Sequence, residues 1–395
     1  MPGFITASHR AAAMGRRAPG DLLPALWLAI FFAGLLVGLP ACAQEVVIGQ
    51  TLALSGPSAA TAKELLRGRE ACVNYINGHG GIRGNAMRLV TRDDQGAPAR
   101  AASLERVLAD KDGVAVMFGA MGPTVNAVLI DWAESSGMTV IDPYGGNIEN
   151  RLTRADTTFF MTANQSAEAE RLAQHIASLG FSRVATVYSA DSSGRAAMAA
   201  LEEGLIVANI AAVAQVTVKP DGSDADAAAR QVYQTNAQAV LLATSGHTTT
   251  AMLRALAAVS SSGMPLLQIY GLSSAASQAD LLKIGGGVPG FSMSQVLPSP
   301  RDPSVPMVAT FLSAMHDAPG ERTYAELEGC MAPLLLADIL RRKPSDLTRA
   351  GILKTMRGAG RVDLGGFQID LANRSQPGSR FTDIVYMGGS GRISR

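Results

Sequence analysis

The first residues whose types and spacing could do chemistry form a glycine-rich turn, Gly119-Ala-Met-Gly122-Pro123-Thr124. The turn follows the apolar run Val114–Phe118, which is typical of a buried strand, and it precedes a helical pattern over Val125–Ser136. Backbone N–H groups at a helix N-terminus, with the Thr124 hydroxyl beside them, favour an anion such as a carboxylate. The sequence therefore predicts a ligand-binding turn here, with the alternative that Thr124 only caps the helix.

Two similar turns follow other strand candidates. Ser55-Gly56-Pro-Ser58 comes after the first apolar run, and Asp142-Pro-Tyr144-Gly145-Gly146-Asn147 comes after the fourth. Each turn alone is weak evidence, because Gly, Pro, Asn and Ser fill most turns. Ligands of open α/β sheets bind at the carboxyl ends of the strands, so three such turns at one sheet edge indicate a binding site.

Motifs for catalysis, nucleotide binding and metal binding are absent from the sequence. The paired carboxylates Asp93 and Asp94 have no matching His or Lys nearby, so we expect them to brace a loop. The chain has no CxxC, GxxxxGK[ST] or GxSxG motif, and its five histidines are scattered. We therefore expect no catalytic residue, no cofactor and no metal site. An exported hydrolase that uses a Ser or an Asp pair is the rival hypothesis from another class.

The elements that position these turns alternate between short apolar runs and amphipathic segments. Strands are predicted at Val46–Leu52, Met87–Arg92, Val114–Phe118, Thr139–Ile141, Arg183–Tyr188, Val213–Val218, Ala239–Ala243 and Leu266–Tyr270. Helices are predicted at Ala62–Asn77, Pro98–Lys111, Val125–Ser136, Ala167–Leu179, Arg195–Ala208, Ala225–Thr235, Thr248–Ser261 and Gln278–Ile284. This alternation indicates parallel βαβ units in two series, and hence an α/β protein with two lobes.

The C-terminal third breaks the alternation. Helices are predicted at Val305–Asp317, Tyr324–Arg342 and Asp346–Arg357, and strands at Gly365–Ala372 and Phe381–Gly388.

The N-terminal segment has the pattern of a secretory signal. Three arginines precede the uncharged 15-residue run Ala25–Leu39, and Ala41-Cys42-Ala43 follows as an A-x-A cleavage site. We expect cleavage near Ala43 and a periplasmic mature protein. The run is short for a membrane anchor, while Leu39-Pro-Ala-Cys42 leaves lipid attachment at Cys42 open, and Met14 is an alternative start.

The charge count argues against nucleic-acid binding, and the cysteine count permits one disulfide bond. The 395 residues contain 34 Lys and Arg against 33 Asp and Glu, and residues 44–395 contain 31 and 32. A near-neutral chain with 5% aromatic residues has no basic face for nucleic acid. Cleavage leaves Cys72 and Cys330, which an oxidising compartment permits to form a disulfide, although two buried thiols are equally compatible with the apolar patterns around them.

Seven motifs carry a resemblance to a known family over about Val46–Gly391. They are Ile48-Gly49 with Leu54-Ser55-Gly56, Asn77-x-x-Gly80-Gly-Ile82-x-Gly84 with Asp93-Asp94, Phe118-Gly-x-x-Gly122-Pro-Thr124, Ser294-Gln-Val-Leu-Pro298-x-Pro300, Leu327-Glu-Gly329, Leu347-Thr-Arg349 and Leu364-Gly-Gly-Phe367. In this order and spacing they resemble the branched-chain amino-acid-type (Leu/Ile/Val-binding-like) solute-binding proteins of ABC transporters, the type I periplasmic binding proteins.

The resemblance implies two Rossmann-like lobes joined by three crossover segments, here near Phe159–Ala163, Phe291–Val296 and Arg361–Phe367. The first lobe would comprise residues 44–160 and 297–360, and the second residues 161–296 and 361–395, after a signal peptide at 1–43. It also implies a monomer without catalysis that closes on an amino acid or related small carboxylate and presents this solute to an ABC permease in the inner membrane.

The resemblance places the ligand site in the cleft between the lobes. The predicted ligand-binding residues are Ser55, Gly122, Pro123, Thr124, Tyr144, Gly145, Gly146, Asn164, Gln165, Ser193 and His247. Several departures from the family pattern remove aromatic or hydroxyl groups, because Gly145 stands where a Thr is frequent, Gln165 where a Tyr is usual, and Ser193 and Gly246 where aromatics are usual. A wider, more polar pocket is expected, and with it a ligand other than Leu, Ile or Val. A ligand sensor of the same fold is an alternative, whereas the export signal disfavours a DNA-binding regulator.

Overall fold

The computed structural model describes Gly3 and residues 45–56, 58–145, 156–284, 290–343, 346–373, 376–388 and 393–394. The chain divides into two units, residues 1–43 and 44–395, and every element described below belongs to the second. Apart from Gly3, the expected signal peptide with Cys42 lies outside the described residues, as does Gly146. Within the described ranges, we find no helix with the length and hydrophobicity that crossing a membrane requires.

The first sheet is parallel throughout, with the strand order β2-β1-β3-β4-β5. Its strands are β1 (Val46–Leu52), β2 (Met87–Asp93), β3 (Val116–Phe118), β4 (Thr139–Ile141) and β5 (Thr158–Phe159), and the helices between them are α2 (Ala59–Gly78), α3 (Pro98–Asp110) and α4 (Pro123–Ser136). All but one residue of β1 are buried, as expected for a central strand that helices cover on both faces.

The second sheet has seven strands in the order β14-β13-β10-β9-β8-β6-β7. The strands β6 (Arg183–Ser189), β7 (Ala211–Val218), β8 (Ala239–Ala243), β9 (Gln268–Gly271) and β10 (Phe291–Gln295) are parallel, while β13 (Asp383–Met387) and β14 (Ile393–Ser394) are antiparallel additions. The helices are α6 (Gln165–Ser178), α7 (Ser192–Val207), α8 (Ala225–Gln234), α9 (Gly246–Ser261) and α10 (Gln278–Leu282). The predicted α/β class with two Rossmann-like sheets is confirmed.

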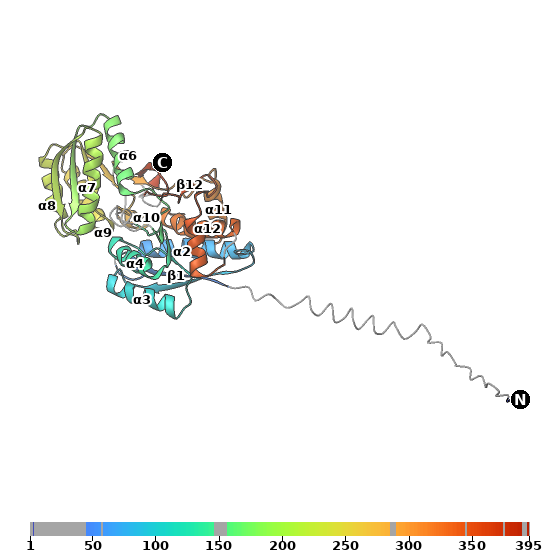
Figure 1. Ribbon diagram of the computed structural model, residues 1–395. Coiled ribbons are helices and arrows are strands. Elements are labelled where there is room, and N and C mark those ends of the chain that lie inside the picture. The colour runs from blue at the N-terminus through green and yellow to red at the C-terminus, as the bar shows by residue number, and fades with distance from the viewer. Residues whose placement is uncertain are drawn as a thin grey trace. The chain divides into compact units, whose positions relative to one another are not determined.

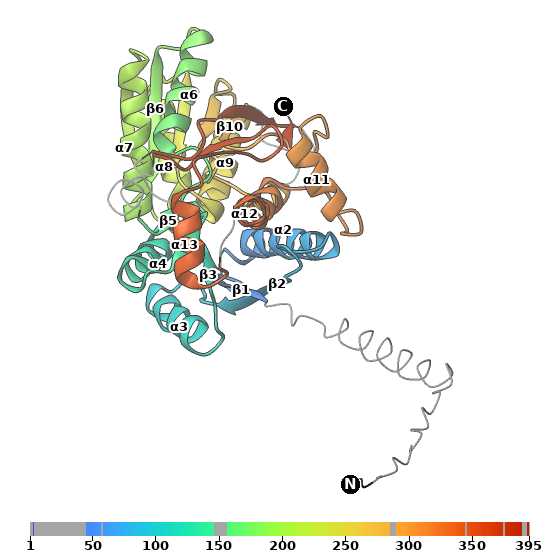
Figure 2. The ribbon, with the colours of Figure 1, turned by 45° about the vertical axis from the view of Figure 1, so that its right-hand side comes forward.

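The late helices return to the first sheet. The chain forms α11 (Pro306–Ala314), α12 (Tyr324–Arg342) and α13 (Arg349–Arg357), and α12 lies against α2 in both ribbon views (Figures 1 and 2). The buried side chains of α12 join those of α2 in one hydrophobic core. We call the first sheet with α2, α3, α4, α11, α12 and α13 the first lobe, and the second sheet with α6 to α10 the second lobe.

The third crossover differs from the expectation. Arg361–Phe367 was predicted to cross between the lobes, but it belongs to a hairpin of β11 (Arg361–Asp363) and β12 (Gln368–Asp370). Gly365 and Gly366 both have positive φ, at 72° and 87°, and this allows the tight turn between β11 and β12, so that only Gln368–Asp370 of the strand predicted at Gly365–Ala372 is extended. Val362, Phe367 and Ile369 pack in the core of the first lobe, so the chain crosses between Asp370 and Asp383. The exact residue boundaries of the lobes stay a prediction.

Two glycines and a disulfide hold α2 against α12. Cys72 and Cys330 are bonded, with their Cα atoms 5.2 Å apart, which decides between the two alternatives left open for these cysteines. A Cβ placed on Gly68 would lie 1.9 Å from the Glu326 carbonyl oxygen, and one on Gly329 would lie 2.2 Å from the Leu65 carbonyl oxygen. The two helix backbones therefore touch where no side chain fits between them.

Gly68→Ala is expected to lower the free energy of unfolding by about 2–4 kcal/mol, because its methyl group meets backbone atoms that no rotamer change can move away. Gly78→Ala is the matched control, since it changes the same helix at a position with open space around it. Urea unfolding followed by circular dichroism measures both variants. Equal stability of the two would contradict the close approach of α2 and α12.

Candidate functional site

A pocket enclosing about 70 Å³ lies where the two lobes meet the first two crossover segments. Glu64 of α2 and Glu328 of α12 line it from the first lobe, and Gln165 and Glu168 of α6 line it from the second. Other walls come from Thr162 and Ala163 after β5, from Ser273, Ser274 and Ala276–Gln278 around the start of α10, from Gln295 and Val296 at the end of β10, and from Pro300, Arg301, Arg322–Ala325 and Ile393. Because the crossovers form part of its wall, the pocket lies on the hinge side of the interlobe space.

Three of the predicted site residues line this pocket: Tyr144, Gly145 and Gln165. Burial raises the pKa of the Tyr144 hydroxyl well above its usual value, and the nearby Glu328 and Glu64 add to the shift. The phenol is therefore a neutral hydrogen-bonding group at any physiological pH.

The turn at Gly122–Thr124 lies beside the Tyr144 turn but outside the pocket lining. The Gly122 N–H donates to the Tyr144 carbonyl at 3.2 Å, and Met121 forms a parallel bridge with Tyr144. Gly122 precedes α4 with φ 85°, Pro123 and Thr124 open the helix, and the Thr124 side chain is exposed. The predicted convergence of these two turns at one sheet edge is confirmed, while their contact with a ligand stays a prediction.

The remaining predicted residues lie outside the pocket lining and have other partners or exposed positions. The Asn164 side chain accepts from the Ala167 N–H at 3.0 Å and caps α6. Ser193 lies in the first turn of α7, and the His247 side chain is exposed in the first turn of α9. Their contact with a ligand also stays a prediction.

Asp93 and Asp94 brace a loop, as the sequence predicted, and Ser55, a predicted ligand-binding residue, takes part in this brace. The Ser55 hydroxyl donates to Asp93 Oδ2 at 2.7 Å, and the Leu54 and Gln95 N–H groups each donate to Asp93 Oδ1 at 3.0 Å. The hydrogen bond from Ser55 holds the pKa of Asp93 below its usual range. Asp93 is therefore a structural carboxylate.

The pocket acids Glu64, Glu168 and Glu328 are the functional candidates that sequence reasoning missed. Glu168 accepts from the Ser273 N–H at 2.7 Å and from the Ser294 hydroxyl at 2.6 Å, so it links α6 to two other parts of the second lobe. Glu64 is 6% exposed, and burial raises its pKa to about 7. A signal was present, because Glu64 shares one helix face with Gly68 and Cys72 at i, i+4 and i+8, which is the face that a core contact needs.

A fully buried arginine, Arg69, braces the turn that begins at Gly119. Arg69 Nη1 donates to Gln50 Oε1 at 2.6 Å and Nη2 donates to the Gly119 carbonyl at 3.0 Å, with the guanidinium 5.5 Å from the centre of the Phe118 ring. Burial lowers the pKa of Arg69 to about 10, against the opposing charges of Asp142 and Glu328. Arg69 thus remains a cation and ties α2 to the turn that begins at Gly119.

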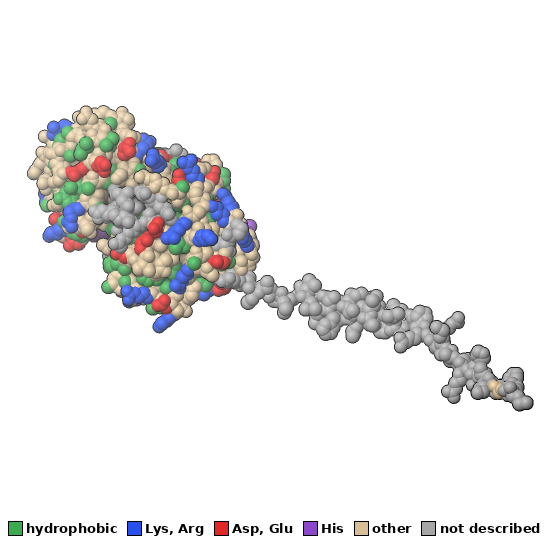
Figure 3. All heavy atoms as spheres, viewed as in Figure 1, with side chains coloured by type: hydrophobic (Ala, Val, Ile, Leu, Met, Phe, Trp, Pro, Cys, Tyr) green, Lys and Arg blue, Asp and Glu red, His purple; other side chains and the backbone are tan. Residues whose placement is uncertain are grey.

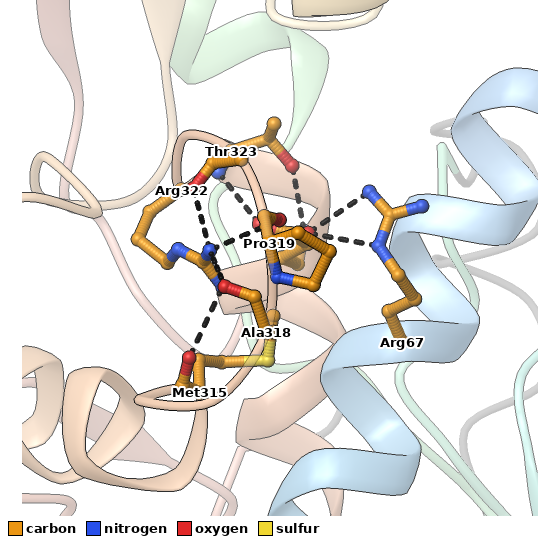
Figure 4. A network of polar contacts seen from close by, with 8 residues as sticks. Arg67, Met315, Ala318, Pro319, Arg322 and Thr323 are labelled. Atoms are coloured by element: carbon orange, nitrogen blue, oxygen red, sulfur yellow. Dashed lines mark hydrogen bonds and ion pairs between the residues drawn. The ribbon is translucent and has the colours of Figure 1, made fainter.

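Two arginines near the start of α12, Arg67 and Arg322, have their guanidinium groups engaged in hydrogen bonds (Figure 4). Arg67 donates to Glu326 Oε1 from Nε at 3.0 Å and from Nη2 at 2.9 Å, and Glu326 closes a capping box with Thr323. Arg322 lines the pocket, but its guanidinium donates to the carbonyl oxygens of Met315, Ala318, Pro319 and Gly320. Arg322 therefore shapes the loop before α12.

The charged surface has no single-sign face in the view of Figure 3, where Lys and Arg side chains alternate with Asp and Glu. Within the described ranges, no group of three His, Cys, Asp or Glu is arranged to hold a metal ion.

Comparisons with known proteins agree with this architecture. A family model described as "Periplasmic binding protein" matches residues 45–384. The Leu/Ile/Val-binding protein homolog 3 of Brucella melitensis is 23% identical over 197 residues, which are 50% of this chain and 53% of the relative. The chain thus spans about half the length of the curated relatives it matches.

Two solved structures align over nearly the whole fold. An extracellular ligand-binding receptor from Verminephrobacter eiseniae is 26% identical with a TM-score of 0.80, covering 89% of this chain and 100% of that one. An ABC transporter substrate-binding protein from Desulfitobacterium hafniense, in complex with Leu, is 19% identical with a TM-score of 0.74, covering 89% of this chain and 99% of that one. The family consists of substrate-binding proteins, and its name places its members in the periplasm. With its two α/β lobes, its interlobe pocket and a family match over 340 residues, this chain belongs to the periplasmic binding protein family.

Proposed function

We propose that this protein is the solute-binding component of an ABC importer. It binds an amino acid or a related small carboxylate between its lobes and presents it, as a periplasmic monomer, to a permease in the inner membrane. The observation that carries the proposal is the pocket, which takes side chains from both lobes and from two crossover segments. The name of the Brucella relative, a Leu/Ile/Val-binding protein homolog, supports an amino-acid-type ligand.

The arrangement of the lobes supports a mechanism in which ligand binding changes the conformation that the permease recognises. Each lobe has its own hydrophobic core, and the crossovers at Phe159–Gln165, Gln295–Pro306 and Asp370–Asp383 link them. A ligand that contacts Tyr144 on one side and Gln165 on the other favours the closed arrangement by its differential contacts. The closed arrangement is the one that a permease would recognise. No catalysis is proposed, so the ligand should be released chemically unchanged.

We assign the ligand carboxylate to the N–H groups and the Thr124 hydroxyl at the start of α4, while Gln165 contacts the ligand from α6. Thr124→Ala and Gln165→Ala are each expected to weaken binding about 3- to 10-fold, the value of a neutral hydrogen bond. Titration calorimetry with a panel of amino acids and small carboxylates measures both variants. Ser135→Ala is the control, because it removes an exposed hydroxyl from the same helix, α4. Unchanged affinity in Thr124→Ala would remove the carboxylate anchor from this turn.

A further inference from the structure

The buried pocket atoms that lack a hydrogen-bond partner among the described residues are both hydrogen-bond acceptors. Glu64 Oε2 and Gln165 Oε1 are both buried and have no hydrogen-bond partner among the described residues. They line the same pocket from opposite lobes, Glu64 from α2 and Gln165 from α6. A buried acceptor without a donor has lost its hydrogen bonds to water, which is unfavourable in free energy. A ligand that donates to both atoms restores these hydrogen bonds and therefore binds more favourably.

The cations of the pocket wall are already engaged. Arg322 donates to four backbone carbonyls, and Arg301 donates to the Ile393 carbonyl while its Nη1 lies 3.8 Å from Glu321 Oε2. The wall also carries the carboxylates of Glu64, Glu168 and Glu328. The end of a ligand that enters this pocket therefore meets acceptors and negative charge, which suits a cationic donor and repels a carboxylate.

We propose that the solute carries a protonated amine at the end opposite its carboxylate, and that Glu64 Oε2 receives this ammonium group on the hinge side of the pocket, with Gln165 Oε1 as a second acceptor. The inference rests on the function proposed above and specifies its ligand class. The two charged ends of the ligand would lie apart, because Thr124, which is assigned to the carboxylate, does not line the pocket that contains Glu64. The ligand class is thus a basic or ω-amino acid.

The titration of Glu64 gives the proposal a pH dependence with a defined sign. Besides Arg67 on its own helix, the groups that act on Glu64 are Glu326 at the start of α12, Asp280 of α10 and the Thr323 side chain, which lowers the pKa of the carboxyl group while Oε2 stays without a hydrogen-bond partner among the described residues. Burial is the largest cause of its pKa of about 7. An ammonium group binds the ionised carboxylate, whose fraction rises about tenfold between pH 6 and pH 8. The affinity for such a ligand should rise by about the same factor over this range.

The test uses ligand pairs that differ only in the terminal amine. Titration calorimetry at pH 8 compares lysine with norleucine, and 5-aminovalerate with valerate. The amine-bearing member should bind roughly 10- to 100-fold more tightly, the value of a charge-assisted hydrogen bond. Glu64→Gln should abolish this preference and the pH dependence. Glu70→Gln, an exposed position on the same helix, should leave both unchanged.

The outcomes separate this inference from the proposed function. If norleucine and valerate bind as tightly as their amine-bearing partners, the amine assignment is wrong while the binding function stands. If no member of the panel binds, the proposed function itself is wrong. A preference that survives Glu64→Gln, or an affinity that falls with rising pH, removes Glu64 as the ammonium acceptor. Should Glu64→Gln fail to fold, the ligand pairs and the pH profile of the unmodified protein still decide.

Discussion

Arg69→Met should destabilise the protein by about 3–5 kcal/mol, the usual cost of removing one partner from a buried polar and ionic network. Arg69 is 0% exposed, and its guanidinium satisfies Gln50 Oε1 and the Gly119 carbonyl. Methionine fills a similar volume, but it leaves both acceptors without this donor. It also removes the positive charge that acts on the buried carboxylates of Asp142 and Glu328.

Urea unfolding at neutral pH measures this loss, with Lys63→Met as the control. Lys63 is an exposed cation on the same helix, so its replacement should change the free energy of unfolding by less than about 0.5 kcal/mol. A loss below 1 kcal/mol in Arg69→Met would show that the surrounding groups find other donors. That result would contradict the role of Arg69 as the support of the Gly119 turn.

Glu105→Gln should make the protein more stable at pH 8 and flatten its pH dependence. Glu105 is 0% exposed, both carboxyl oxygens have no hydrogen-bond partner among the described residues, and burial raises its pKa to about 8. A pKa raised by folding means that the folded state holds the proton more strongly than the unfolded state. The resulting stabilisation is complete below pH 4.5 and is lost as the pH rises towards 8.

The contribution of Glu105 to the free energy of unfolding should fall by roughly 3 kcal/mol between pH 5 and pH 8. Thermal and urea unfolding at both pH values measures the difference in slope between Glu105→Gln and the unmodified protein. Asp110→Asn changes an exposed acid at the end of the same helix and should reproduce the unmodified slope. Identical slopes for Glu105→Gln and the unmodified protein would mean that Glu105 is ionised in the folded state.

The fold was largely predictable because its signals are local. Buried parallel strands such as β3 and β8 read as continuous apolar runs, and the turns after them carry Gly. Errors arose where a local pattern was ambiguous. The strand predicted at Gly365–Ala372 forms over Gln368–Asp370, whereas Gly365 and Gly366, with positive φ, make the turn that joins it to the unpredicted strand β11.

The candidate site was predictable only in part, because it depends on contacts distant in sequence. Tyr144 and Gln165 follow strands or begin helices at the expected sheet edges, and they do line the pocket. Glu64 and Glu328 lie within helices, and they reach the pocket only because α2 and α12 pack together. That packing joins residues about 260 positions apart, so no local window of sequence contains it.

The bond between Cys72 and Cys330 sets an order of events during biogenesis. Its two cysteines are 258 residues apart, and nearly all of the second lobe lies between them in the chain. The whole of α6 to β10 precedes α12 in the chain, so α2 lacks its partner until the chain has been delivered as far as α12. Oxidation therefore requires nearly the whole chain to be present, and it then fixes α2 to α12 covalently. A chain truncated before Cys330 would leave Cys72 as a free thiol on an uncovered helix face.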